Sequence, residues 1–130
     1  MRFENLKCNF YKLWGNNVAS IIESLLNVLP ASRLITDPEI LHTRRHDYWI
    51  MSHLDDHQDR AAGMPACVVR PVTTDEVVAV VNECRKENKA LIPFGLGSGV
   101  CGGVIANPDA IMIDLSDMNN IRGIDETNLL

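Results

Sequence analysis

Apolar residues recur at helical spacing near the start of the chain. Between residues 18 and 29, apolar side chains repeat every three or four positions and predict an amphipathic helix (Val18, Ile21, Ile22, Leu25, Leu26 and Leu29). Asn16 or Asn17 can cap this helix, and Pro30 ends it. Because the polar face is not basic, we expect the apolar stripe to pack within its own domain rather than on a membrane surface.

The next segment is less regular. Asp37-Pro38 favours the start of a short helix that ends near Arg44. Residues 46–60 are mostly polar, and we interpret them as a solvated connector. All four histidines lie in or beside this connector, and two pairs have the i, i+4 spacing that can bring two imidazoles onto one metal ion (His42 with His46, His53 with His57). The glutamate of the H-E-x-x-H motif is missing, so a connector is preferred over a metal site.

A strand, a helix and a second strand are predicted between residues 66 and 92. Pro71 ends the first apolar run. Thr73 and Glu76 then have the spacing of a capping box, and Asn88 is a suitable left-handed terminator for the helix that follows. Such a βαβ unit should contain parallel strands joined by a right-handed crossover.

The pattern changes again after the turn at Asn107-Pro108-Asp109. Residues 110–115 alternate as a strand, with three apolar side chains on one face (Ile111, Ile113 and Leu115). Residues 121–124 predict a further strand, in which Gly123 can form a bulge. This strand has not obtained its next partner when the sequence stops, so we expect a domain that continues beyond residue 130.

Glycines concentrate directly after the second predicted strand. Five of the eight glycines fall within residues 95–103. This density indicates tight turns with positive φ and a close approach of backbone N–H groups to another group, most commonly an oxyanion such as phosphate. The loop follows the carboxyl end of a predicted parallel strand, where open α/β sheets bind ligands.

Two common phosphate-binding motifs do not fit this loop. Residues 97–102 satisfy G-x-G-x-x-G, and Asp117 lies 20 residues after Gly97. A nicotinamide-binding Rossmann motif opens a helix, however, whereas a turn and a strand pattern follow here. A Walker A loop is excluded because no Lys-Ser or Lys-Thr pair follows the glycines.

Composition narrows the functional classes. A net charge of -5 and the lack of a basic stripe argue against nucleic acid as a partner. The four cysteines form no C-x-x-C pair; two lie in apolar runs that suit reduced core thiols, and we expect Cys101 to be a small buried residue. The sequence shows neither a secretory signal nor a bilayer-spanning stretch, so we expect a soluble cytoplasmic protein.

Several motifs, in order, carry a resemblance to a known family. They are Pro65-x-x-Val68-Val69-x-Pro71, Thr74-x-Glu76-Val77, the run at residues 92–103, and Ile113-Asp114-Leu115-Ser116-x-Met118-Asn119 with Ile124-Asp125. Together they resemble the opening of the FAD-binding domain of FAD-linked oxidases of the vanillyl-alcohol-oxidase/PCMH type. The most similar branch contains glycolate oxidase subunits, D-lactate dehydrogenases and alkylglycerone-phosphate synthases. The resemblance covers residues 64–130 and, more loosely, residues 29–48.

The resemblance implies FAD as cofactor, with its pyrophosphate wrapped by the glycine loop. The implied cofactor-binding residues are Pro93, Phe94, Gly95, Leu96, Gly97, Ser98, Gly99, Val100, Gly102 and Gly103, and Ser98 would add a hydroxyl donor. Leu96 stands where relatives usually have glycine, so its side chain must point away from the cofactor. The loop contains no histidine for covalent attachment, which implies non-covalent FAD.

The implied fold is α+β with an α/β subdomain, the N-terminal βαβ part of a PCMH-type FAD-binding domain preceded by helices. Residues 1–63 would be a helical and connecting segment, and residues 64–130 the start of the FAD-binding domain, truncated at its C-terminal side. In the family a separate cap domain supplies the substrate-binding and catalytic residues, so none is assigned here, and no metal ligand either.

The family's reaction transfers a hydride to flavin, usually from the carbinol carbon of a 2-hydroxy acid. We therefore expect the FAD-binding portion of an FAD-dependent oxidoreductase, which is inactive alone. A separate chain that carries the remainder of the oxidase is a candidate partner. One alternative is a non-catalytic remnant or interaction module that keeps the fold without the cofactor. Others are a fragment of an ether-lipid enzyme like alkylglycerone-phosphate synthase and, last, a nicotinamide-binding domain.

Overall fold

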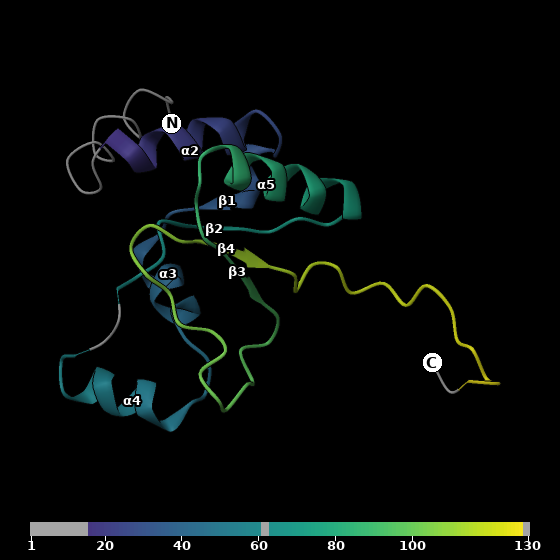
Figure 1. The fold of residues 1–130 in the computed structure, drawn as a ribbon. Helices are drawn as coiled ribbons and strands as arrows, with labels where there is room; N and C mark the ends of the chain where they lie inside the picture. The colour runs from purple at the N-terminus through teal and green to yellow at the C-terminus, as the bar shows by residue number, and fades with distance from the viewer. Residues whose placement is uncertain (1–15, 61–62, 129–130) are drawn as a thin grey trace.

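A four-stranded sheet forms the centre of the computed structural model, which describes residues 16–60 and 63–128 (Figure 1). Its strand order is β1-β2-β4-β3, formed by Leu34–Ile35, Cys67–Val69, Ile111–Asp114 and Leu91–Phe94, respectively. Strand β4 pairs in parallel with both β2 and β3, whereas β1 pairs antiparallel with β2. The strands of the predicted βαβ unit are therefore parallel, as predicted, but β4 lies between them.

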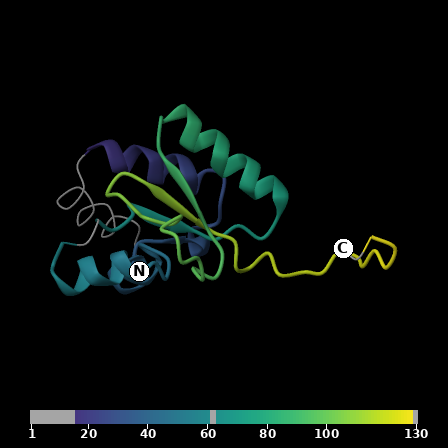
Figure 2. The same ribbon diagram turned by 60° about the horizontal axis from the view of Figure 1, so that its bottom comes forward.

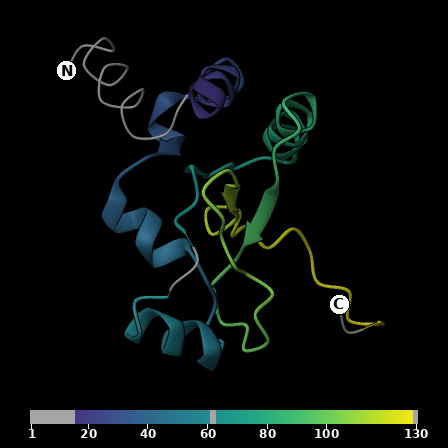
Figure 3. The same ribbon diagram turned by 60° about the vertical axis from the view of Figure 1, so that its left-hand side comes forward.

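Helices α2 (Asn16–Leu26) and α5 (Thr74–Lys86) lie next to each other over one face of the sheet, which we call the helical face (Figures 1 and 3). Their apolar stripes and the side chains of this face form one core cluster (Val18, Ile21, Leu25, Leu29, Ala66, Cys67, Val69, Val80, Cys84, Ile111 and Ile113). Burial of each large aliphatic side chain contributes about 2 kcal/mol. The prediction that the first helix packs within its own domain is confirmed.

Helix α5 has the predicted ends. The hydroxyl of Thr73 accepts a hydrogen bond from the N–H of Glu76, and the Glu76 carboxylate accepts one from the N–H of Thr73. After the helix, Asn88 adopts a positive φ of 51°. The capping box and the left-handed terminator are both confirmed.

The opposite face of the sheet, which we call the loop face, is covered by α3 (Pro38–Arg44) and by the chain between β3 and β4 (Figure 1). Its smaller core contains Leu41, Val68, Phe94, Ala106 and Met112. Successive strand residues point to opposite faces, so the central strands contribute to both cores. Helix α3 begins as predicted, because the Asp37 carboxylate accepts hydrogen bonds from the N–H groups of Glu39 and Ile40.

Residues Ile50–His57 form helix α4, so the interpretation of residues 46–60 as a solvated connector was wrong there. The apolar pattern gave no signal because this helix buries no apolar stripe. Ile50 is 72% exposed, and Met51 and Leu54 are also exposed. Its position instead depends on polar contacts made by the preceding residues, which are described below.

The strand predicted at residues 121–124 is absent. Residues 115–128 leave the sheet as an extended segment, drawn in yellow in Figures 1 and 2. Ile121 and Ile124 are 84% and 78% exposed. A strand requires partners for its backbone N–H and C=O groups, and an alternating sequence cannot supply them by itself.

The described residues on either side of position 63 share one sheet. Strand β1 and helix α2 precede it, and they pack on β2 and α5, which follow it.

Cys67 and Cys84 are buried free thiols, as predicted for a reduced core, and burial raises the pKa of Cys84 to about 11. No helix in residues 16–60 or 63–128 is long and apolar enough to cross a membrane.

Candidate functional site

The glycine loop, residues 95–103, begins at the carboxyl end of β3 and runs beside the connection between α3 and α4 (Figures 1 and 3). Leu96 and Val100 expose 85% and 66% of their surface, and Ser98 is exposed as well. Gly97 and Gly102 have φ angles of 67° and 73°. The predicted need for glycine at positive φ is confirmed at these two positions.

The loop's backbone N–H groups are available to a ligand. Within the described part of the chain, none of the N–H groups of residues 95–103 donates a hydrogen bond. Two carbonyl groups of the loop are held instead, because the N–H of Tyr48 donates to the oxygens of Gly97 (3.2 Å) and Gly99 (2.8 Å). Successive backbone N–H groups without a protein acceptor are characteristic of anion-binding loops.

Three glycines allow close packing against the protein itself. A Cβ atom would lie 2.6 Å from the Phe94 ring at Gly97, 2.9 Å from the Asp47 carboxylate at Gly99, and 2.7 Å from the Trp49 ring at Gly102. Gly95 differs, since nothing lies within 4 Å of its added Cβ. The expectation that the glycines serve a ligand therefore explains only part of the loop, and close packing against Phe94, Asp47 and Trp49 explains the rest.

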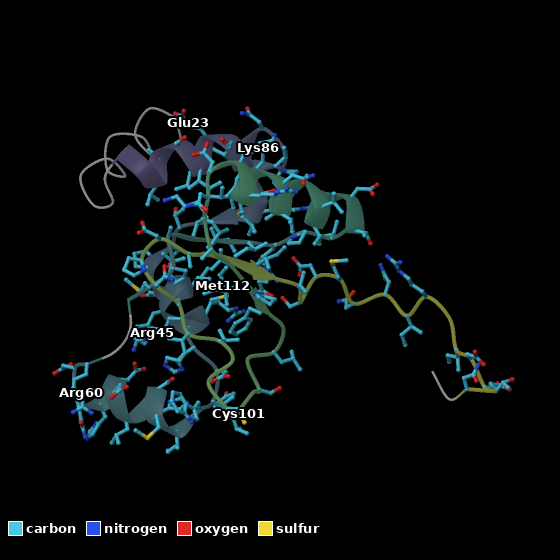
Figure 4. All side chains as sticks on the ribbon, viewed as in Figure 1. Glu23, Arg45, Arg60, Lys86, Cys101 and Met112 are labelled. Atoms are coloured by element: carbon cyan, nitrogen blue, oxygen red, sulfur yellow. The ribbon has the colours of Figure 1, made fainter. Side chains whose placement is uncertain are left out.

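Cys101 is exposed, so the prediction of a buried side chain was wrong. Figure 4 shows it at the outer end of the loop, far from Met112 in the sheet. The preceding glycines carry the chain away from the sheet before it returns at Val104, and this excursion could not be read from the residue type alone.

An open cleft of about 420 Å³ lies between the loop and the histidine-rich segment. It is lined from α3, α4, their connection and the end of β3, with His42, Arg44, His46, His53 and Leu96 among its residues. The sequence placed the histidines and the glycine loop in separate segments. Only the tertiary structure brings them together, and no local spacing signals this.

Two of the four histidines, His46 and His53, make contacts with other side chains and with the backbone. His46 Nε2 lies 2.8 Å from a carboxylate oxygen of Asp56, and its Nδ1 lies 2.7 Å from the Asp47 carbonyl oxygen. The His53 ring meets His46 edge-on and stacks with Tyr48. In residues 16–60 and 63–128, no group of three or more His, Cys, Asp or Glu side chains could hold a metal ion.

A partly buried ion pair connects α3 to the strand ends beside the loop. Arg44 Nε donates to Asp114 at 3.0 Å, and the guanidinium lies 5.0 Å from the centre of the Phe94 ring, beneath Gly97. Burial alone would raise the pKa of Asp114, but hydrogen bonds from Ser116 and the charge of Arg44 bring it below its ordinary value. The site therefore contains an ionised carboxylate that helps to hold Arg44 against Phe94.

Residues 65–130 match the family described as FAD binding domain. The chain belongs to this family. The match covers β2 to β4 together with the glycine loop and the extended segment after β4. The resemblance to FAD-linked oxidases is thus confirmed.

Curated relatives of this FAD-binding domain are much longer than the chain. The glycolate oxidase subunit GlcD of Bacillus subtilis is 33% identical over 66 residues, which are 51% of this chain and 14% of that protein. The mitochondrial D-2-hydroxyglutarate dehydrogenase of Danio rerio is 29% identical over 102 residues, or 78% of this chain and 17% of that protein. The chain thus spans less than a fifth of either relative.

Solved structures have the same fold. An alkyldihydroxyacetonephosphate synthase superposes with a TM-score of 0.74 at 20% identity, covering 84% of this chain and 21% of that one. A p-cresol methylhydroxylase with substrate bound gives 0.67 at 18% identity, covering 88% and 21%. These likenesses concern the fold alone, and they confirm the predicted N-terminal part of a PCMH-type FAD-binding domain.

The chemistry of the loop fits FAD, whose pyrophosphate presents anionic oxygens to hydrogen-bond donors. The loop follows the end of a parallel strand, and it contains N–H groups without a protein acceptor within the described residues, two glycines with positive φ and the exposed Ser98. FAD as the cofactor is confirmed by membership of the family. The individual contact residues and the non-covalent attachment remain predictions.

Proposed function

We propose that this chain supplies the FAD-binding portion of an FAD-dependent oxidoreductase that oxidises a 2-hydroxy acid or a related small molecule. The observation that supports the proposal most strongly is the glycine loop of an FAD-binding domain, in which successive N–H groups donate no hydrogen bond within the described part of the protein. Curated relatives are named for glycolate, D-lactate and D-2-hydroxyglutarate, which are all 2-hydroxy acids. The chain spans 14% to 17% of the length of these relatives, so we propose this reaction for the whole enzyme of which the chain supplies the FAD-binding portion.

In this proposal the loop binds the pyrophosphate through its main chain. Backbone N–H groups between Gly95 and Gly103 donate to the phosphate oxygens, and the Ser98 hydroxyl adds a donor. Phe94, the last residue of β3, is 4% exposed and supports Gly97 from below. Pro93 precedes it in the strand, and Leu96 directs its side chain to solvent. When bound, FAD supplies the hydride acceptor, and the chain binds and orients it non-covalently.

Gly95→Val tests the loop assignment directly. An added Cβ at Gly95 meets nothing within 4 Å, so the fold should tolerate valine, whereas the branched side chain would obstruct a ligand that approaches the backbone. Gly123→Val is the matched control, since a Cβ there also meets nothing within 4 Å. An NMR titration of the ¹⁵N-labelled chain with FAD should shift the amide signals of residues 95–103 in the wild type and in Gly123→Val.

We expect the 130-residue chain to bind FAD with a dissociation constant above about 1 μM, because it spans less than a fifth of the length of these relatives. Gly95→Val should weaken binding by about tenfold or more, which corresponds to about 1.4 kcal/mol. Loop signals that ignore FAD in the wild type, or equal affinities in the two valine variants, would contradict the proposal.

A further inference from the structure

We propose that Asp47 is a positioning residue that holds the glycine loop in the shape that presents its N–H groups. For its FAD readout this inference rests on the proposed function. Asp47 lies between α3 and α4, about fifty positions before the loop in the sequence, and it is 3% exposed. A buried carboxylate needs hydrogen-bond donors, and all of those that Asp47 uses are backbone N–H groups.

The first group of contacts fixes the base of the loop. Asp47 Oδ2 accepts from the N–H of Val104 at 3.3 Å, and the Asp47 N–H donates to the Val104 carbonyl at 3.1 Å. The other carboxylate oxygen accepts from the N–H of Trp49 at 3.1 Å. One residue thereby links the returning end of the loop to the residues that begin α4.

The second group of contacts fixes the middle of the loop. A Cβ at Gly99 would lie 2.9 Å from Asp47 Oδ2, and one at Gly103 would lie 3.9 Å from it, so the loop bends around this carboxylate. The adjacent Tyr48 N–H holds the carbonyls of Gly97 and Gly99. Residues 47 and 48 therefore engage the side of the loop that is turned toward the protein, while the loop N–H groups remain unused.

The carboxylate has two opposing effects on an anionic ligand. Its negative charge repels pyrophosphate, whereas its hydrogen bonds pre-organise the donors that bind pyrophosphate. Asp47→Asn separates these effects. The amide keeps the size of the side chain and removes the charge, but it has one acceptor oxygen, so one of the two N–H donors then faces an NH₂ group.

The sign of the change in FAD affinity therefore shows which of the two effects of Asp47 is larger. If the charge is what matters, Asp47→Asn binds FAD more tightly than the wild type. If Asp47 positions the loop, Asp47→Asn binds FAD about tenfold more weakly, as expected when a hydrogen bond to a charged group is lost. Asp75→Asn, an exposed aspartate in the first turn of α5, is the matched control and should bind as the wild type does.

The experiment measures two quantities on each folded variant by NMR. Amide hydrogen exchange at Val104 and Trp49 reports the hydrogen bonds of Asp47 without any ligand, and an FAD titration reports loop function. We expect Asp47→Asn to accelerate exchange at one or both amides by about tenfold and to weaken FAD binding to a similar extent. Unchanged exchange would overturn the inference, and so would unchanged or tighter FAD binding by the variant when the wild type binds FAD.

A second variant covers the case in which Asp47→Asn does not fold. Gly99→Ala keeps the charge but places a Cβ 2.9 Å from Asp47 Oδ2, so it should both accelerate exchange at Val104 and weaken FAD binding. A Gly99→Ala chain that behaves as the wild type in both measurements would equally overturn the inference. If wild-type loop amides ignore FAD, the proposed function fails, while faster exchange at Val104 in Asp47→Asn would still establish that Asp47 holds the loop.

Discussion

The two faces of the sheet are built by different means. On the helical face, α2 and α5 bury a continuous apolar cluster that reaches from Val18 to Ile113. On the loop face, the apolar cluster is smaller, and much of the contact is polar or made by backbone: the Arg44–Asp114 pair, the Asp47 carboxylate and the carbonyls held by Tyr48. Apolar burial is non-directional, whereas hydrogen bonds specify geometry.

This difference separates stability from positioning. The helical face supplies most of the driving force for folding, since it holds most of the large buried side chains. The loop face specifies where each backbone group of the glycine loop lies. Substitutions on the two faces should therefore affect different measurements.

Leu25→Ala on the helical face should have the largest effect. Leu25 is fully buried, and removal of its side chain leaves a cavity that costs about 3 kcal/mol of unfolding free energy. Urea unfolding measures this loss, with Val78→Ala as control because Val78 is 53% exposed on α5. The loop amides of folded Leu25→Ala should respond to FAD as in the wild type; a selective loss of FAD binding would erase the distinction between the faces.

Gly97→Ala on the loop face should cost about 2 kcal/mol, because alanine is strained at positive φ and its Cβ would lie 2.6 Å from the Phe94 ring. Phe94→Leu shortens that side chain and should recover the steric part of the cost but not the backbone part. Gly95→Ala, with open space around the new Cβ, should leave the unfolding midpoint unchanged. Equal costs at positions 95 and 97 would show that backbone packing does not distinguish these glycines.

Asp114→Asn should have the smallest effect, about 1.5 kcal/mol at neutral pH, through the weakened contacts to Arg44 and Ser116. The folded-state pKa of Asp114 lies below its ordinary value of 3.8, so its ionised form stabilises the fold above that pH. The difference between wild type and variant should shrink as the pH falls below 3.8. Urea midpoints measured across this range test the sign; a difference that grows toward acid pH would contradict it.

Helices and strands with strong local signals were predictable from the sequence. The apolar stripe of α2, the capping residues Asp37 and Thr73, and the alternation in β4 each depend on residues close together in the chain. Helix α4 and the unpaired residues 121–124 were not predictable in this way. Helix α4 exposes its apolar residues, so it has no buried apolar stripe that the sequence pattern could reveal. Residues 121–124 have a pattern that favours a strand, but no partner strand lies beside them among the described residues.

By itself, the sequence determined the local elements that carry a strong pattern or capping signal, the position of the glycine loop after a parallel strand, and the relationship to FAD-linked oxidases. Only the tertiary structure decided that β4 enters between β2 and β3, and that residues 47–49 pack into the glycine loop. Glycines that belong to one sequence motif consequently have two roles. Gly97, Gly99 and Gly102 pack against other parts of the protein, whereas Gly95 is open to solvent. The physical reason is that residue spacing specifies short-range geometry, whereas the partner of a backbone surface is chosen by contacts between distant segments.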